Sequence, residues 1–138
     1  MSEKSNNTEL VEIYKEEAQH LIGVMRDGLS RLKENSDDGI RNKLYWENFR
    51  CAHTLKGSSE CAGFYRIGEI NKTLTQIFRS AKEGKFKINA DFIPLLSDVV
   101  EACRKILNGE EVRNYEELLK PLKTVNRILE RRQMQTTK

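Results

Sequence analysis

The sequence predicts an all-α fold, an up-and-down antiparallel helical bundle, on three observations. Helix-forming residues such as Leu, Glu, Lys, Arg and Ala dominate, and the 138 residues include only 2 prolines and 8 glycines. Apolar residues recur in steps of three and four, and no run alternates as a half-buried strand would. Five such segments are joined by short links, which favour antiparallel neighbours. This length predicts one domain, at about residues 8–132, with frayed ends at residues 1–7 and 133–138.

The first helix is predicted at about residues 9–33. Thr8 precedes it and is a suitable N-cap, because its hydroxyl can accept a hydrogen bond from a free backbone N–H of the first turn. The polar residues 35–39 predict a turn after it. Its apolar stripe consists of Leu10, Ile13, Tyr14, Ala18, Leu21, Ile22, Met25, Leu29 and Leu32.

The second helix is predicted at about residues 40–62, and Gly63 permits a sharp change of direction after it. On a helical wheel, His53 lies roughly 110° from the centre of the apolar stripe. The imidazole should therefore lie on the flank of this helix, neither in the core nor pointing fully outward. The predicted core stripe consists of Tyr45, Phe49, Ala52, Leu55, Ser59 and Ala62.

Three further helices complete the bundle. The third is predicted at about residues 65–83 and the fourth at about residues 92–107, where Pro94 is tolerated because it lies in the first turn. The fifth is predicted at about residues 115–131. Pro121 should kink this helix or mark its true start, because proline removes a helical hydrogen bond.

Bulk charge and hydropathy exclude some function classes. The net charge of +3 is mild and both signs interleave, so nucleic-acid binding is not expected. No apolar run approaches the roughly 20 residues that span a bilayer, so no membrane partner is expected either. Residues 1–7 are short and polar, unlike a secretory signal, so the expected location is the cytoplasm.

Three cysteines, Cys51, Cys61 and Cys103, are predicted to be small buried hydrophobic residues in a reducing compartment. Their number is odd and no C-x-x-C occurs, which argues against a disulfide framework or a zinc site. Cys51 and His53 are two residues apart on a helix and diverge by about 200°. No metal site is therefore predicted.

The most informative motif is Ala-His-Thr-Leu-Lys-Gly-Ser-Ser at residues 52–59. Lys56 and Gly57 follow His53 by three and four residues, so both border the space beside its imidazole. A lysine there can hold an anion, and a glycine keeps the surface low enough for another protein to reach the ring. The pattern indicates a histidine that carries a phosphoryl group. The alternatives are a histidine without a role, a solvated Lys56 and a glycine that serves only packing; His20 is expected to be a structural or edge residue.

Residues 49–64, Phe-Arg-Cys-Ala-His-Thr-Leu-Lys-Gly-Ser-Ser-Glu-Cys-Ala-Gly-Phe, resemble the phosphorylation-site helix of histidine phosphotransfer (HPt) domains. The likeness is greatest to the N-terminal phosphotransfer domain of CheA-type chemotaxis kinases, and with the segment at 81–98 it spans about residues 8–107. It implies a four-helix HPt core plus a fifth helix. It also implies that His53 accepts and donates a phosphoryl group, that Lys56 helps to hold that group, and that Gly57 lets a partner approach.

Two positions depart from the CheA pattern. The family glutamate that accepts the Nδ1–H bond of the histidine corresponds to Thr75, and a second family histidine corresponds to Lys72. A threonine hydroxyl can accept a hydrogen bond but brings no negative charge, so it would raise the basicity of the imidazole less. Thr75 is therefore either a weak Nδ1 partner or a filler at the helix interface.

The chemistry that follows is transfer between proteins. If Nδ1 keeps its proton, Nε2 of His53 is free to attack phosphorus. We expect His53 to take a phosphoryl group from a histidine kinase catalytic domain and pass it to an aspartate of a response-regulator receiver domain, in chemotaxis-like two-component signalling. Trp46, Arg50 and Lys72 are expected to bind the partner, with Arg66 beside them.

The sequence contains no glycine-rich nucleotide loop and no carboxylate cluster suited to a metal. Autonomous kinase activity is therefore not expected, no cofactor is expected on this domain, and ATP and Mg²⁺ are expected on the partner domains. Two alternatives remain beside a domain of a CheA-type kinase. One is a free-standing or hybrid-kinase HPt phosphorelay protein. The other is a degenerate helical adaptor without phosphotransfer.

Overall fold

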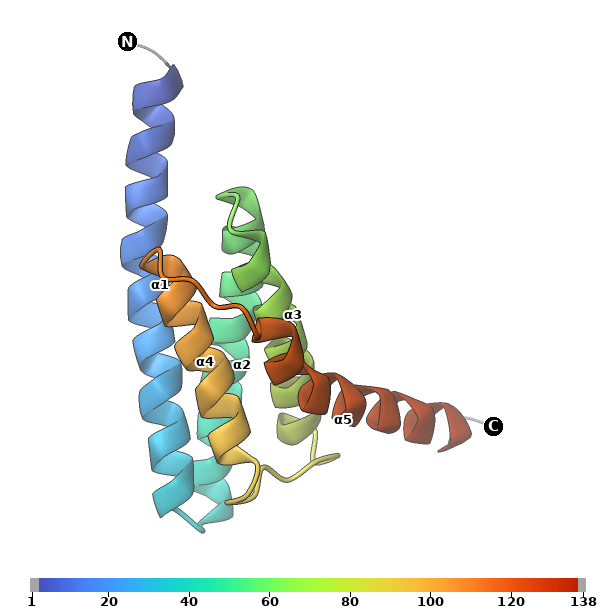
Figure 1. The fold of residues 1–138 in the computed structure, drawn as a ribbon. Helices are drawn as coiled ribbons and strands as arrows, with labels where there is room; N and C mark the ends of the chain where they lie inside the picture. The colour runs from blue at the N-terminus through green and yellow to red at the C-terminus, as the bar shows by residue number, and fades with distance from the viewer. Residues whose placement is uncertain (1–2, 137–138) are drawn as a thin grey trace.

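Five helices make up the computed structural model, which describes the backbone of residues 3–136 and the side chains of residues 8–134. No strand occurs in that range, and the predicted all-α bundle is confirmed. Helices α1 to α4 run alternately down and up beside one another, and α5 then leads away from them (Figure 1). Of the ends expected to fray, residues 1–2 and 137–138 lie outside the described residues. The helices are α1 Glu3–Glu34, α2 Asp38–Cys61, α3 Tyr65–Lys82, α4 Ile93–Leu107 and α5 Tyr115–Thr136.

Helix α1 is longer than the sequence predicted. It begins at Glu3, so Thr8 lies inside the helix and the prediction that Thr8 is its N-cap was wrong. The first turns of α1 extend past the ends of the neighbouring helices (Figure 1). Leu10 and Ile13, which were assigned to the core stripe, are therefore 62% and 61% exposed, and Tyr14 is buried.

Both ends of α2 follow from local chemistry. Asp37 is the N-cap, because its Oδ1 accepts a hydrogen bond from the backbone N–H of Ile40 at 3.0 Å. Helix α2 therefore starts slightly earlier than predicted. At its other end Gly63 has a φ of +87°, a left-handed conformation that side chains disfavour, and the chain turns there into α3.

The buried face of α2 is wider than the predicted stripe, of which Tyr45, Ala52, Leu55 and Ser59 are buried as predicted. Leu44, Asn48 and Cys51 are buried, whereas Phe49 is only partly buried against the edge of the core. A helix packed between two others buries a wider arc than its apolar residues alone define. Phe49 lies at the edge of this arc, at the boundary between the core and the exposed surface that carries the site.

One buried cation holds several segments together at the lower end of the bundle. Arg41 is 7% exposed, and its Nη1 donates to the backbone oxygens of Leu32 at 2.7 Å and Asn35 at 2.9 Å. Its Nη2 donates to the Tyr45 hydroxyl at 3.1 Å and to the backbone oxygen of Ile88. Carbonyls at the C-terminus of α1 are the negative end of the helix dipole, which favours a cation there. The sequence pattern gave no sign of this contact.

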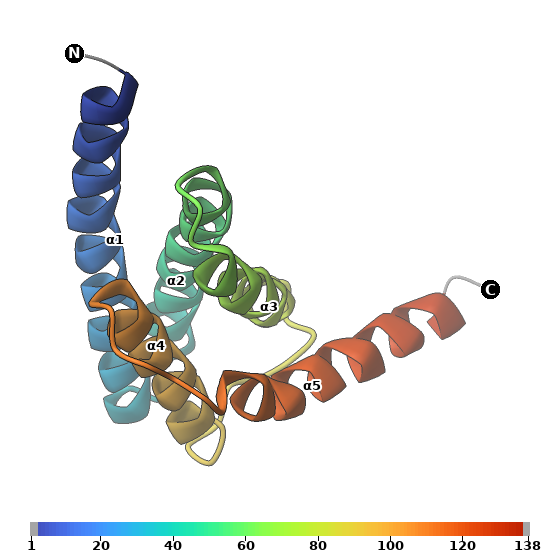
Figure 2. The same cartoon turned by 45° about the horizontal axis from the view of Figure 1, so that its top comes forward.

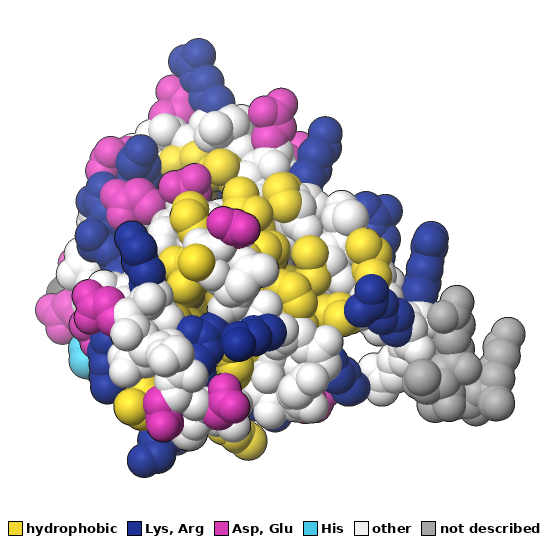
Figure 3. Space-filling view, turned by 90° about the horizontal axis from the view of Figure 1, so that it is seen from below, with side chains coloured by type: hydrophobic (Ala, Val, Ile, Leu, Met, Phe, Trp, Pro, Cys, Tyr) yellow, Lys and Arg dark blue, Asp and Glu magenta, His cyan; other side chains and the backbone are white. Residues whose placement is uncertain are grey.

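The loop between α3 and α4 closes the same end. Phe86 and Phe92 pack edge to face, with ring centroids 5.0 Å apart, and Ile88 between them in sequence is fully buried. Seen from below, a band of hydrophobic side chains crosses this end and is bordered by residues of both charges (Figure 3).

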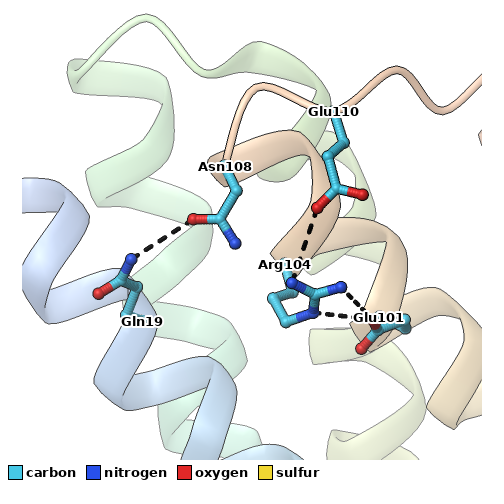
Figure 4. Close-up of polar contacts among 5 residues, drawn as sticks. All are labelled: Gln19, Glu101, Arg104, Asn108 and Glu110. Atoms are coloured by element: carbon cyan, nitrogen blue, oxygen red, sulfur yellow. Dashed lines mark hydrogen bonds and ion pairs between the residues drawn. The ribbon is translucent and has the colours of Figure 1, made fainter.

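Polar side chains form contacts around the C-terminal end of α4 (Figure 4). Arg104 donates from Nε to Oε1 of Glu101 at 2.7 Å, and its Nη1 lies 3.7 Å from Oε2 of Glu110. Asn108 accepts a hydrogen bond from Gln19 of α1 at 3.5 Å. The hydrogen bond from Arg104 lowers the pKa of the Glu101 carboxyl.

Helix α5 packs on α3 and α4 with its first turns and then diverges from the bundle (Figure 2). Leu119 and Leu122 are fully buried, whereas Ile128 further along is 46% exposed. Pro121 lies inside the helix, which begins at Tyr115, so the prediction that proline could mark its true start was wrong. Pro121 has no N–H to donate to the carbonyl of Glu117, four residues earlier, so one helical hydrogen bond is missing at that turn.

Candidate functional site

His53 lies on the exposed flank of α2, directly after the fully buried Ala52. The helical period places neighbouring residues on different faces, so a buried Ala52 leaves the next side chain at the edge of the core. The imidazole is therefore open to a partner molecule, as the wheel predicted.

Three rings of α2 form a row that we call the aromatic ladder: Trp46, Phe49 and His53. The Phe49 and His53 rings are stacked, with centroids 5.8 Å apart and planes inclined by 19°. Trp46 meets Phe49 edge to face at 6.2 Å and 87°. Spacings of three and four residues put these rings on one face of the helix. Because Trp46 is 51% exposed, the ladder presents apolar area beside the imidazole.

Two cations of α3 lie over the ladder. The guanidinium carbon of Arg79 lies 5.5 Å from the Phe49 ring centroid. The Lys82 ammonium lies 4.1 Å from the Trp46 centroid and 4.9 Å from that of Phe49. Cations are attracted to the faces of aromatic rings. Sequence reasoning missed both residues; the signal that could have found them is the antiparallel register of α2 and α3 across the short turn at Gly63.

That register also locates Thr75. Arg79 lies over Phe49 and Gly68 lies against Glu60, so the same antiparallel register puts Thr75 level with His53. Its side chain, however, is only 2% exposed, and its hydroxyl donates to the backbone oxygen of Asn71 at 2.6 Å. Within the part of the chain that the structure describes, neither ring nitrogen of His53 has a hydrogen-bond partner. Of the two roles considered for Thr75, this arrangement fits the interface filler.

The remaining predicted residues divide between two surfaces. Lys56 is partly buried, and Gly57 beside it is exposed, with no atom within 4 Å of a Cβ built on it. Arg50 is exposed on α2. Lys72 is exposed on α3, but it lines a cavity of about 660 Å³ between α3 and α5, where Lys123 pairs with Glu69 at 3.1 Å. Trp46 is therefore connected to the imidazole through Phe49, whereas Lys72 faces α5.

The cysteines differ from one another. Cys51 and Cys103 are buried as predicted, and burial raises their pKa to about 11 and about 12. The prediction that Cys61 is buried was wrong: it is the last residue of α2 and is exposed. Among the described residues, no three His, Cys, Asp or Glu side chains are grouped so that they could hold a metal ion.

No helix in the described part of the chain combines the length and the apolar character needed to span a bilayer.

Comparison with solved structures supports the fold. The phosphorylated P1 domain of CheA3 in complex with CheY6 from R. sphaeroides superposes with a TM-score of 0.75 at 16% identity. The superposition covers 88% of this chain and 98% of that one.

Two curated relatives are similar in sequence. The chemotaxis protein CheA of Borreliella burgdorferi is 31% identical over 101 residues, which are 73% of this chain and 11% of the relative. The CheA of Listeria monocytogenes is 23% identical over 96 residues, 70% of this chain and 14% of the relative. The chain thus spans about a tenth of the length of these relatives. The family model for the Hpt domain matches residues 9–109, most of the chain and all of the His53 motif. The chain therefore belongs to the Hpt domain family.

Proposed function

We propose that this domain carries a phosphoryl group on Nε2 of His53, taking it from a histidine kinase catalytic domain and passing it to an aspartate of a response-regulator receiver domain. The observation that carries the proposal is an exposed imidazole at the centre of a motif of the Hpt family, with Lys56 and Gly57 one turn further along. The structural neighbour supports it, because it is a phosphorylated domain of the same fold in complex with CheY6.

Each transfer is a substitution at phosphorus. The Nε2 lone pair forms the N–P bond as the bond from phosphorus to the leaving oxygen of ATP breaks, and Nδ1 keeps its proton. A carboxylate oxygen of the receiver then forms a bond to phosphorus, the N–P bond breaks, and the neutral imidazole is regenerated. Such reactions depend mainly on alignment and on neutralisation of charge. We place ATP and Mg²⁺ on the partner domains.

The charges around His53 suit this chemistry. Lys56 and Arg50 on α2 and Arg79 and Lys82 on α3 are all cationic, and the last two are fixed over the aromatic ladder. A cationic surface favours the phosphoryl dianion and complements an acidic receiver pocket. The exposed apolar area of Trp46 supplies a contact that excludes water, as aromatic residues do at interfaces.

The chain offers a matched control for the decisive experiment, because His20 is exposed and is the only other histidine. The protein is incubated with a CheA-type kinase core and ATP, and separately with phosphorylated receiver domains, and acid-labile phosphate is measured. The wild type and His20→Gln should take up label, and His53→Gln should not. Label that persists in His53→Gln contradicts the proposal. Absence of label from the wild type with every donor favours an adaptor without phosphotransfer.

The role of Thr75 is open to a direct test. Thr75→Val keeps the shape of the side chain and removes the hydroxyl, which the structure pairs with the backbone of Asn71. We expect the rate of His53 labelling to remain that of the wild type. A large loss of rate in a folded variant would show instead that the hydroxyl accepts a hydrogen bond from the imidazole.

The proposed location is the cytoplasm, where kinases and receivers of two-component systems meet.

A further inference from the structure

In the part of the chain that the structure describes, His53 lacks the hydrogen bond that commonly orients a histidine ring. A histidine that binds a group commonly donates its other ring N–H to an acceptor, which fixes the ring and its tautomer. Within the described residues His53 has no such acceptor: the level Thr75 is buried, and the bond that its hydroxyl makes is to the backbone oxygen of Asn71. The ring contact that the structure shows is the stack on Phe49, at 5.8 Å and 19°.

Phe49 is itself held from several directions. It is partly buried and packs against the hydrophobic core. Trp46 meets it edge to face, and Arg79 and Lys82 lie 5.5 Å and 4.9 Å from its centroid. These contacts with the core and with two cations of α3 restrict the Phe49 ring. A partly exposed imidazole that stacks on such a surface has fewer accessible orientations than one that projects freely into water.

We propose that Phe49 is a positioning residue for the phosphoryl carrier: it orients the imidazole by stacking, in the place of a hydrogen-bonding carboxylate. This inference rests on the proposed function of His53. Stacking limits the plane of the ring without adding charge, and it does not specify which ring nitrogen carries the proton. Phe49 touches neither phosphorus nor the partner's reacting atoms and acts only through His53.

The geometry can be tested before any phosphate is transferred. In a His20→Gln background, His53 is the only histidine, and its ring protons are resolved by NMR. A ring stacked on a phenyl face experiences a ring current, so we expect upfield shifts in the wild type that are lost in Phe49→Leu and recovered in Phe49→Tyr. Leucine keeps most of the apolar volume at this partly buried position, and an amide spectrum confirms that the variant is folded.

The kinetic consequence separates positioning from docking. An aromatic pair of this kind shifts a local equilibrium about two- to tenfold, so Phe49→Leu should lower the transfer rate at saturating receiver by that factor. The receiver concentration at half-maximal rate should stay unchanged, and Phe49→Tyr should restore the rate. Trp46→Leu, which removes exposed apolar area and one contact of Phe49, should raise that concentration.

Each outcome decides something. A folded Phe49→Leu that transfers at the wild-type saturating rate overturns the positioning role while the proposed function of His53 stands. Ring-proton shifts of His53 that do not differ between the wild type and Phe49→Leu overturn it as well. A wild-type chain that takes no label overturns the proposed function, and the positioning role falls with it even where the NMR experiment confirms the stack.

Discussion

Gly57→Ala should stabilise the fold and impair its function. Glycine inside a helix costs about 1 kcal/mol relative to alanine. No atom lies within 4 Å of a Cβ built on Gly57, so nothing in the domain offsets that gain. A gain of this size corresponds to a rise in melting temperature of about 3 °C for a domain of this length. The glycine therefore destabilises the isolated domain, which points to a use outside it.

The expected use is the close approach of the partner. A methyl group one turn from His53 would hold the receiver away, and a displacement of about 1 Å between reacting groups can lower the rate about 100-fold. Thermal unfolding and the rate of transfer from phosphorylated domain to receiver are measured together. Gly23→Ala in α1, which also has no neighbour within 4 Å, is the control and should be equally stabilised with unchanged transfer. Unimpaired transfer by Gly57→Ala, or its destabilisation, would refute this reasoning.

Two further predictions concern the core and its thiols. A Cβ on Gly28 would lie 2.8 Å from Oδ1 of the fully buried Asn48, so Gly28→Ala should cost about 1–3 kcal/mol in urea unfolding. Adding Asn48→Ala should remove part of that cost, and strictly additive effects would contradict the contact. At pH 8 iodoacetamide should modify the exposed Cys61 alone, because a pKa of about 11 for Cys51 and about 12 for Cys103 leaves at most about one thiolate in a thousand. Mass spectrometry that finds a second adduct before unfolding would disprove it.

The sequence predicted the helices and turns because each depends on residues that are close together in the chain. The turn between α1 and α2, the change of direction at Gly63 and the three- and four-residue steps of apolar residues each depend on a few neighbouring positions. The exposure of His53 followed from the same periodicity. The length of α1 did not, because whether Leu10 is buried depends on where the neighbouring helices end. Cys61 was misplaced for a similar reason, since it lies on the last turn of its helix.

The parts of the site that the sequence did not predict are contacts between helices. Arg79 and Lys82 read as ordinary charges on a solvated face of their own helix, and only the register of α3 against α2 brings them over Phe49 and Trp46. Helical periodicity indicates which face of one helix is apolar but not how two helices are aligned. For Thr75, the family resemblance implied a position beside His53. It did not predict that the side chain is buried and bonds to the backbone of Asn71, because both depend on how the helices pack.

The guanidinium of Arg41 gives the two ends of the bundle different responses to acid. Its acceptors are carbonyl and hydroxyl oxygens, which do not titrate in the acid range, so this fastening persists as the pH falls. At the other end the pKa of Glu101 is lowered by Arg104, so its contribution is present above the ordinary carboxyl pKa and is lost as the pH falls through the lowered value. Acidification should therefore weaken the pair of Glu101 and Arg104 on α4 first, while the hydrogen bonds of Arg41 persist.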